Sequence, residues 1–288
     1  MLQPELGPIV DVDELGDLGR LPDHLVIADV RWYLDGRSGR AAYEAGHVPG
    51  AIYVDLDTAL AGHGHPATAG RHPFPTPEQF AASMSGLGIG DDTTVIAYDD
   101  SGGGTAGRLV WMLRILGRRA ALLNGGLRAW PEPHETGRGR MFAPARFTTR
   151  PWPSDRFADA DESARAAASV DGVVLDARSG DRFRGESESI DHRAGHIPGA
   201  TSAPWGANLD PTTGRFHPAA QLRAHFAELG VEPDGDERGP LICSCGSGVS
   251  ACANLLGLER AGFTGARLFV ASWSGWSADP DHPVATGP

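Results

Sequence analysis

Three short motifs occur twice in this chain of 288 residues, in the same order and at nearly the same offset. The matching pairs are 25–31 with 173–178, 46–51 with 195–200, and 95–99 with 241–245. Ordered matches of this kind indicate an internal duplication. The chain is therefore predicted to hold two related domains of about 130 residues each, which is a usual domain size. We expect the first over 1–132 and the second over 159–288, with a linker over 133–158 in a region rich in Pro, Arg and Gly.

Each copy alternates short runs of β-forming residues with helical patterns. This alternation predicts an α/β fold in which each domain is a mainly parallel sheet flanked by helices. Strands are expected near 25–29, 51–54, 94–98 and 120–123 in the first copy, and near 173–176, 200–202, 241–244 and 267–270 in the second. Helices are expected near 77–86, 105–117, 218–229 and 250–262.

A cysteine directly follows the expected strand 241–244, and a glycine-containing loop joins it to the next expected helix. This order places the Cys245 thiol at the carboxyl end of a buried strand, where α/β sheets bind their ligands. Glycines let backbone N–H groups turn inward, and a helix adds its positive end, so the loop suits an anion such as a thiolate or a sulfur bound to it. Cys245 is therefore predicted to be a nucleophile.

The other members of the pattern have plainer interpretations. Cys243 and Cys252 fall within the expected strand and helix and are predicted to be small buried residues. The first copy has Asp99 where the second has Cys245. A carboxylate cannot act as a soft sulfur nucleophile, so the first domain is predicted to be non-catalytic.

Composition excludes several classes of function. A net charge of −12 argues against nucleic acid or an anionic membrane as the main partner. All 25 basic residues are arginine, which excludes Schiff-base chemistry, pyridoxal-phosphate attachment and a phosphate loop that carries a lysine. Three cysteines are an odd number and indicate a reducing cytoplasm rather than a disulfide framework. We expect no signal peptide in 1–23 and no membrane span, since no apolar run approaches the roughly 20 residues that a span needs.

Taken together, the motifs resemble those of the tandem-domain rhodanese family, the thiosulfate and 3-mercaptopyruvate sulfurtransferases. The similarity runs from about Val26 to Trp276. It includes Asp29-Val30-Arg31-Trp32, both Gly-His-Val/Ile-Pro-Gly-Ala turns, Gly70-Arg71-His72-Pro73, Asn124-Gly125-Gly126, Gly185-Glu186, the loop from Cys245 to Cys252, and the pair Trp273 and Trp276. The resemblance implies two rhodanese-like domains with the active cysteine in the second.

The resemblance also implies the roles of individual residues. Cys245 would accept sulfur as a persulfide, and Ser247, His72 and Asp57 would relay protons, with Asp55 as the alternative to Asp57. Arg182 would bind the anionic group of the donor. The loop residues Gly246, Gly248, Val249 and Ser250 would line the substrate site. No metal and no organic cofactor is required, and His63 and His65 are expected in a loop without a metal. His47 and His196, one in each repeated turn, are assigned to the architecture.

The sequence of the loop bears on the sulfur donor. Thiosulfate enzymes of the family typically carry two basic residues directly after the cysteine, whereas Gly246 to Ser250 resembles the mercaptopyruvate type. A second substrate arginine common in mercaptopyruvate enzymes is missing near Glu188 unless Arg184 or Arg193 replaces it. In the C-terminal signature, Gly275 stands where the family has a glutamate. We therefore expect 3-mercaptopyruvate as the donor, with thiosulfate as the alternative.

Two other functions are weighed against sulfur transfer. A cysteine phosphatase shares the strand–loop–helix design but needs an arginine six positions after the cysteine, where this chain has Ala251. A non-catalytic persulfide carrier or sensor would leave Ser247, His72 and Asp57 without a purpose. The expected partners are a small anionic sulfur donor and a thiol or cyanide acceptor, with thioredoxin as one candidate. The protein is expected to be a monomer.

Overall fold

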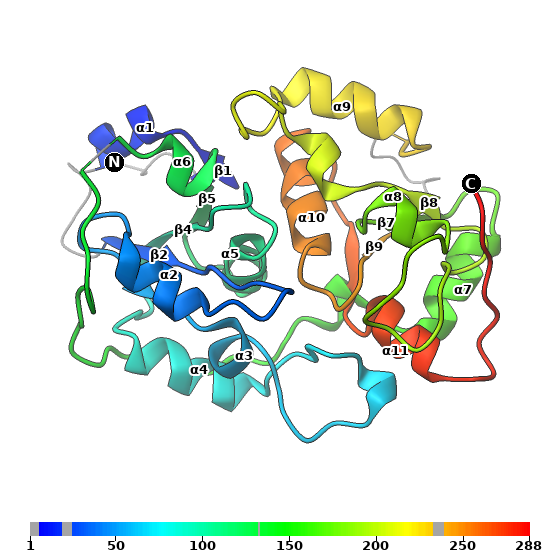
Figure 1. Cartoon of the computed structure of the whole chain (residues 1–288), viewed down its shortest axis with the longest axis horizontal. Helices are drawn as coiled ribbons and strands as arrows, with labels where there is room; N and C mark the ends of the chain where they lie inside the picture. Colours follow the sequence, from blue (N-terminus) through cyan, green and yellow to red (C-terminus); the bar gives the residue numbers. More distant parts are fainter. Residues whose placement is uncertain (1–5, 19–24, 132, 233–238) are drawn as a thin grey trace. The chain divides into compact units, whose positions relative to one another are not determined.

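The computed structural model describes residues 6–18, 25–131, 133–232 and 239–288. The described residues form two compact units that do not simply follow the order of the chain (Figure 1). The first unit comprises Met1–Ala61, Pro75–Trp152 and Asp210–Phe216; the second comprises Gly62–Phe74, Pro153–Leu209 and His217–Pro288. Each half of the chain thus contributes one short segment to the other unit. Of 1–23, where no signal peptide is expected, 1–5 and 19–23 lie outside the described residues.

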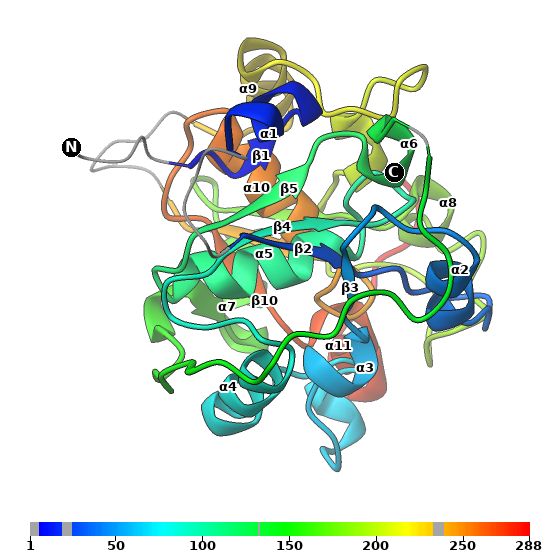
Figure 2. The same cartoon turned by 90° about the vertical axis from the view of Figure 1, so that its left-hand side faces the viewer.

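The first unit is built on a five-stranded parallel sheet with strand order β1-β5-β4-β2-β3, which can be followed in Figure 2. Its strands are β1 (Ile9–Val10), β2 (Leu25–Asp29), β3 (Ile52–Tyr53), β4 (Thr94–Tyr98) and β5 (Ala120–Leu123). Its helices are α1 (Val12–Leu18), α2 (Gly39–Ala45), α3 (Leu56–Ala59), α4 (Pro77–Gly86), α5 (Ala106–Ile115) and α6 (Gly126–Ala129).

The second unit repeats this sheet with strand order β6-β10-β9-β7-β8, again entirely parallel. Its strands are β6 (Phe157–Ala158), β7 (Val173–Asp176), β8 (Thr201–Ser202), β9 (Leu241–Ser244) and β10 (Arg267–Phe269). Its helices are α7 (Ala160–Ala168), α8 (Gly180–Phe183), α9 (Ala219–Glu228), α10 (Ala251–Arg260) and α11 (Ser272–Ala278), with short 3-10 turns η1 (Ala67–Ala69), η2 (Ser154–Arg156) and η3 (Trp205–Asn208).

The eight expected strands and four expected helices are confirmed, with differences of at most two residues at their ends. β1 and β6, one in each sheet, are missed because a two-residue strand carries no hydrophobic period. α7 is also missed, although Asp159 and Glu162 form a capping box at its start, a pattern that was visible in the sequence. The same device starts α4, where Thr76 and Gln79 cap the helix.

In each unit, an equivalent buried Arg–Asp ion pair connects the sheet to the repeated turn. Arg31 binds Asp29 and donates to the Gly46 carbonyl oxygen at 2.7 Å. Arg178 binds Asp176 and donates to the Gly195 carbonyl oxygen at 2.8 Å. The two aspartates are the last residues of β2 and β7, so each pair fixes the end of its strand against the turn that follows.

The turn histidines have structural contacts of one type. His47 Nδ1 lies 2.8 Å from the Tyr43 carbonyl oxygen, and its ring stacks on Tyr43. His196 Nδ1 lies 2.8 Å from the Phe183 carbonyl oxygen and stacks on Phe183 in the same way. The repetition agrees with their assignment to the architecture. Among the described residues, no helix has both the length and the hydropathy needed to cross a membrane.

Candidate active site

Cys245 immediately follows β9 and is buried, with 1% of its surface exposed. The start of α11 holds the backbone on both sides of the thiol. The Cys245 N–H donates to Ser272 Oγ at 3.0 Å, and the Trp273 N–H donates to the Cys245 carbonyl oxygen at 2.9 Å. The Ser274 N–H donates to the Gly246 carbonyl oxygen at 2.8 Å. Ser272 reaches this position with φ of 51°, a strained angle for a residue with a side chain, so the anchor is specific.

Ser247 and His72 meet in the second unit. His72 Nδ1 lies 2.7 Å from Ser247 Oγ, and the two residues are 7% and 6% exposed. They are far apart in the sequence, but the segment Gly62–Phe74 belongs to the same compact unit as the loop. The structure therefore brings together two of the residues that the resemblance implied.

Glycines explain how the segment Gly62–Phe74 fits against α11. A Cβ on Gly275 would lie 2.5 Å from the Thr68 carbonyl oxygen, and a Cβ on Gly70 would lie 2.5 Å from the Ala271 carbonyl oxygen. Ser274 Oγ then accepts the Arg71 N–H at 3.0 Å. The backbone of Thr68 and Gly70 therefore occupies the place where a side chain at position 275 would begin.

Gly275→Ala is expected to lower the free energy of unfolding by about 1–3 kcal/mol, because a Cβ at this position overpacks the contact with the Thr68 backbone. Urea unfolding measures the loss. Ser277→Ala, on the same helix, is the control: its buried hydroxyl has no hydrogen-bond partner among the residues that the structure describes, so its loss costs little. Equal stability of the Gly275→Ala variant and the parent would contradict the close packing.

Two guanidinium groups lie over the start of the cysteine loop. A Cβ on Gly246 would be 3.0 Å from Arg71 Nη2 and 3.5 Å from Arg182 Nη1. Burial, and next the positive charge of Arg182, lower the pKa of the Arg71 guanidinium below its ordinary value. Arg182 was expected here, whereas Arg71 was missed. Its position next to His72 in the motif was the available signal.

The two arginines share acidic partners. Arg182 Nη2 binds Glu188 Oε2 at 2.8 Å and Asp191 Oδ2 at 2.7 Å. Arg71 Nη1 binds the other oxygen of Asp191. Both carboxylates are almost fully buried, at 3% and 2% side-chain exposure. Neither was singled out from the sequence as a functional residue.

Neither alternative for the missing arginine is supported. Arg193 donates to four backbone carbonyl oxygens, those of Trp276, Ser277, Asp279 and His282, and so secures the C-terminal segment. Arg184 pairs with Glu186 at 2.7 Å, and both side chains are exposed. Arg71, from the first half of the chain, is the second arginine at the loop.

Asp57 and Asp55 have different roles in the first unit. Asp55 is the N-cap of α3 and accepts the Thr58 N–H at 2.9 Å. Asp57 Oδ2 accepts the Trp32 Nε1–H at 3.0 Å. Asp55 thus has a structural function, which leaves Asp57 as the candidate, and its part in a proton relay stays a prediction.

The remaining cysteines are buried thiols. Burial raises the pKa of the Cys243 thiol far above its usual range, so this residue stays protonated. Cys252 is buried in α10, and its Sγ–H donates to the Gly248 carbonyl oxygen at 3.5 Å. A Cβ on Gly248, at φ of 71°, would lie 2.5 Å from the Val270 carbonyl oxygen, so the loop requires glycine here. No group of three or more potential metal ligands occurs in the described part of the chain.

The counterpart of the cysteine loop in the first unit holds a carboxylate. Asp99 Oδ1 accepts the N–H groups of Ser101 and Gly103 at 2.9 and 2.8 Å. Asp99 Oδ2 accepts the N–H groups of Thr105 and Ala106 at 2.8 and 2.9 Å, and the Thr105 hydroxyl at 3.0 Å. This strand–loop–helix element therefore wraps its backbone donors around an anion, here supplied by the chain itself.

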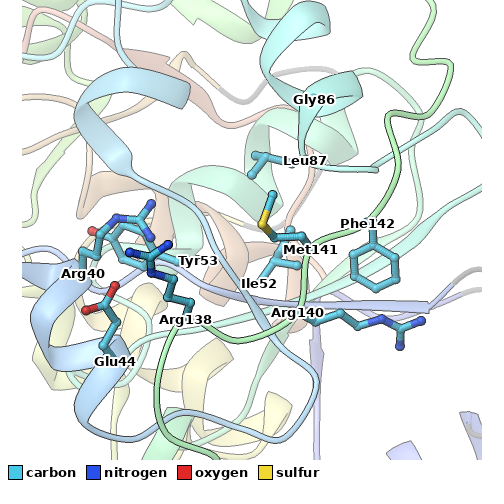
Figure 3. Close-up of a pocket in the computed structure, with 10 residues that line it drawn as sticks. All are labelled: Arg40, Glu44, Ile52, Tyr53, Gly86, Leu87, Arg138, Arg140, Met141 and Phe142. Carbon is cyan, nitrogen blue, oxygen red and sulfur yellow. The ribbon is translucent and has the colours of Figure 1, made fainter.

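A cavity of about 440 Å³ in the first unit offers a different kind of site (Figure 3). One side carries Arg40, Glu44 and Arg138, and the other carries apolar groups that include Ile52 and Met141. None of the residues implied by the resemblance lines it. It holds no nucleophilic thiol, so the cysteine loop remains the candidate active site.

Comparison with known proteins identifies the family of this chain. The model of the rhodanese-like domain matches residues 12–132 and 159–279. A probable 3-mercaptopyruvate sulfurtransferase of Pseudomonas aeruginosa is 41% identical over 92% of this chain and 93% of its own length. A putative thiosulfate sulfurtransferase, SseB of Mycobacterium tuberculosis, is 36% identical over 97% of both chains. The crystal structure of the 3-mercaptopyruvate sulfurtransferase SseA from Escherichia coli superposes with a TM-score of 0.78 at 31% identity, covering 93% of this chain and 99% of SseA. The chain belongs to the rhodanese family and contains two copies of its domain.

Proposed function

We propose that this protein transfers sulfur from 3-mercaptopyruvate, through a persulfide on Cys245, to a thiol or to cyanide. The observation that carries the proposal is the meeting of the Cys245 loop with the Ser247–His72 pair and with the guanidinium groups of Arg71 and Arg182. A soft nucleophile, a proton carrier and an anion-binding pair are the three elements that this reaction needs.

In the first step the Cys245 thiolate attacks the sulfur of the donor. A sulfur–sulfur bond forms, the carbon–sulfur bond of the donor breaks, and its electron pair leaves with pyruvate as the enolate. His72, through Ser247, delivers the proton that converts the enolate to pyruvate. Arg71 and Arg182 bind the carboxylate of the donor, for which a planar guanidinium is well shaped.

In the second step the acceptor attacks the outer sulfur. The sulfur–sulfur bond breaks, the electron pair returns to Cys245 as thiolate, and the acceptor leaves as a persulfide or as thiocyanate. Electrons balance without an external oxidant, so the cycle requires no metal or organic cofactor. The N–H groups of Gly246, Gly248, Val249 and Ser250 stabilise the anionic persulfide. The carboxylate of Asp99 in the equivalent loop supports this role.

The remaining assignments follow from the same scheme. Asp57 is assigned to the proton relay, a role that rests on the resemblance. The first domain, expected over 1–132, is non-catalytic because Asp99 already occupies its anion-binding loop. None of the three cysteines, all of which lie in the described part of the chain, forms a disulfide, which supports a reducing cytoplasmic location with a thiol such as thioredoxin as acceptor. The protein acts as a monomer.

Ser247→Ala and His72→Gln are expected to lower kcat with 3-mercaptopyruvate by about 10²-fold, the usual contribution of a positioned proton carrier. Turnover of thiosulfate is expected to fall much less, because sulfite leaves as a stable anion that needs no proton. Steady-state kinetics with both donors and cyanide measure the effect, and Ser277→Ala is the control serine. Equal losses with the two donors would contradict the proton-transfer role.

Thiosulfate is the second candidate donor. The 36% identical Mycobacterium tuberculosis relative that is named as a putative thiosulfate sulfurtransferase favours it. The loop from Gly246 to Ser250 argues against it, because the loop itself carries no cationic side chain for a dianion.

A further inference from the structure

Asp191 bridges the two arginines that lie over the cysteine loop. One of its carboxylate oxygens binds Arg71 Nη1, and the other accepts from Arg182 Nη2 at 2.7 Å. The Asp191 side chain is only 2% exposed. A donor anion that reaches these guanidinium groups therefore competes with a carboxylate that the protein supplies.

Glu188 is the other carboxylate that binds Arg182, and its contacts differ from those of Asp191. Its Oε1 accepts the backbone N–H groups of Ile190 and Asp191 at 2.9 and 3.0 Å, and it binds Arg182 at 2.8 Å. Glu188 therefore holds the segment that carries Asp191. Among the described residues, the Asp191 carboxylate accepts hydrogen bonds from the two arginine side chains. Its charge acts on the anion-binding groups rather than on the fold of the segment.

The charges near Gly246 cancel. Arg71 and Arg182 carry two positive charges, and Glu188 and Asp191 carry two negative ones. Arg178, which also lies near Glu188, is neutralised by its own partner Asp176. The cysteine loop thus has arginine hydrogen-bond donors without a net positive charge. In a site without net positive charge, the electrostatic free energy of binding is less favourable for a doubly charged anion than for a singly charged one.

We propose that Asp191 determines donor selectivity: it cancels one guanidinium charge, so that the site accepts a monoanionic carboxylate and disfavours a dianion such as thiosulfate. This inference rests on the proposed function. In the mercaptopyruvate enzymes that this chain resembles, an arginine often stands in this region. Here the second arginine comes from position 71, and the local segment contributes a carboxylate instead.

Asp191→Asn tests the proposal, since it removes the charge and retains the size of the side chain. The ratio of kcat/KM for thiosulfate to kcat/KM for 3-mercaptopyruvate is expected to rise by about tenfold, because the dianion gains one more charge–charge interaction than the monoanion. Glu186→Gln is the matched control. It removes the same charge from an exposed pair with Arg184, so the ratio should stay at the parent value.

Binding of inorganic sulfate and of pyruvate, measured by calorimetry on the resting protein, tests the same charge effect without turnover. The affinity ratio of sulfate to pyruvate should rise by a similar factor in Asp191→Asn. If the parent protein turns over neither donor but this ratio changes, the proposed function is wrong and the role of Asp191 stands.

An unchanged ratio in both measurements would overturn the inference, as would an equal loss for both donors, since that is the result of a purely structural role. If Asp191→Asn does not fold, Asp191→Ser serves as the second variant with the same expected ratio. Its shorter side chain also removes the bridge between the arginines.

Discussion

Replacing Cys245 by serine is expected to reduce sulfur transfer with either donor by at least about 10³-fold, as removal of a catalytic nucleophile does. A serine hydroxyl cannot hold the transferred sulfur as a persulfide. The measurement is kcat/KM with 3-mercaptopyruvate and with thiosulfate, using cyanide as acceptor. Intact-protein mass after donor treatment without acceptor adds a second readout: the parent should gain one sulfur atom and the variant none.

Cys252→Ala is the matched control, because Cys252 is a buried thiol in α10 next to the same loop. It should retain activity and still load sulfur. Activity that survives in Cys245→Ser would refute the catalytic assignment. Loading of one sulfur in the parent without turnover would instead identify a persulfide carrier.

Replacing Asp99 by alanine is expected to destabilise the first unit by about 3 kcal/mol. The carboxylate is fully buried and accepts five hydrogen bonds, four of them from backbone N–H groups. Buried donors left without partners cost about 1–3 kcal/mol, and the relaxing loop recovers part of that loss. Urea unfolding monitored by tryptophan fluorescence measures the change.

Asp99→Asn should cost less than Asp99→Ala, because an amide oxygen keeps part of the network. Asp100→Ala is the control on the same loop: Asp100 is exposed and accepts from the Tyr33 hydroxyl at 2.5 Å. Its loss should stay below about 1 kcal/mol. If Asp99→Ala is no less stable than Asp100→Ala, the anion-binding description of the first loop is wrong.

The duplicated α/β fold was predictable because its signals are local. Apolar runs such as 94–98 and 241–244 give buried parallel strands, and each is followed by a helical pattern. The short strands β1 and β6 were not predictable. They exist because a neighbouring strand edge offers hydrogen bonds, as β5 does for Ile9 and Val10.

The candidate site also contains residues that local sequence patterns predict and residues that they do not. Cys245, Ser247 and the loop glycines are adjacent in the sequence, and their pattern of strand, glycine loop and helix marks a nucleophile at the end of a strand. His72 and Arg182 were named through the resemblance, and the structure places both in the unit that contains the loop. Asp57 lies in the first unit, bound to Trp32.

By itself, the sequence determined the duplication and the class of fold, and it predicted the nucleophile. Only the tertiary structure decided which charges surround that nucleophile. Arg71 and Asp191 are 120 residues apart, and they meet because Gly70 and Gly275 let a segment of the first half pack against α11. Contacts of this kind depend on backbone approach and on the room left by absent side chains. No local pattern of hydrophobicity or charge in the sequence predicts such contacts.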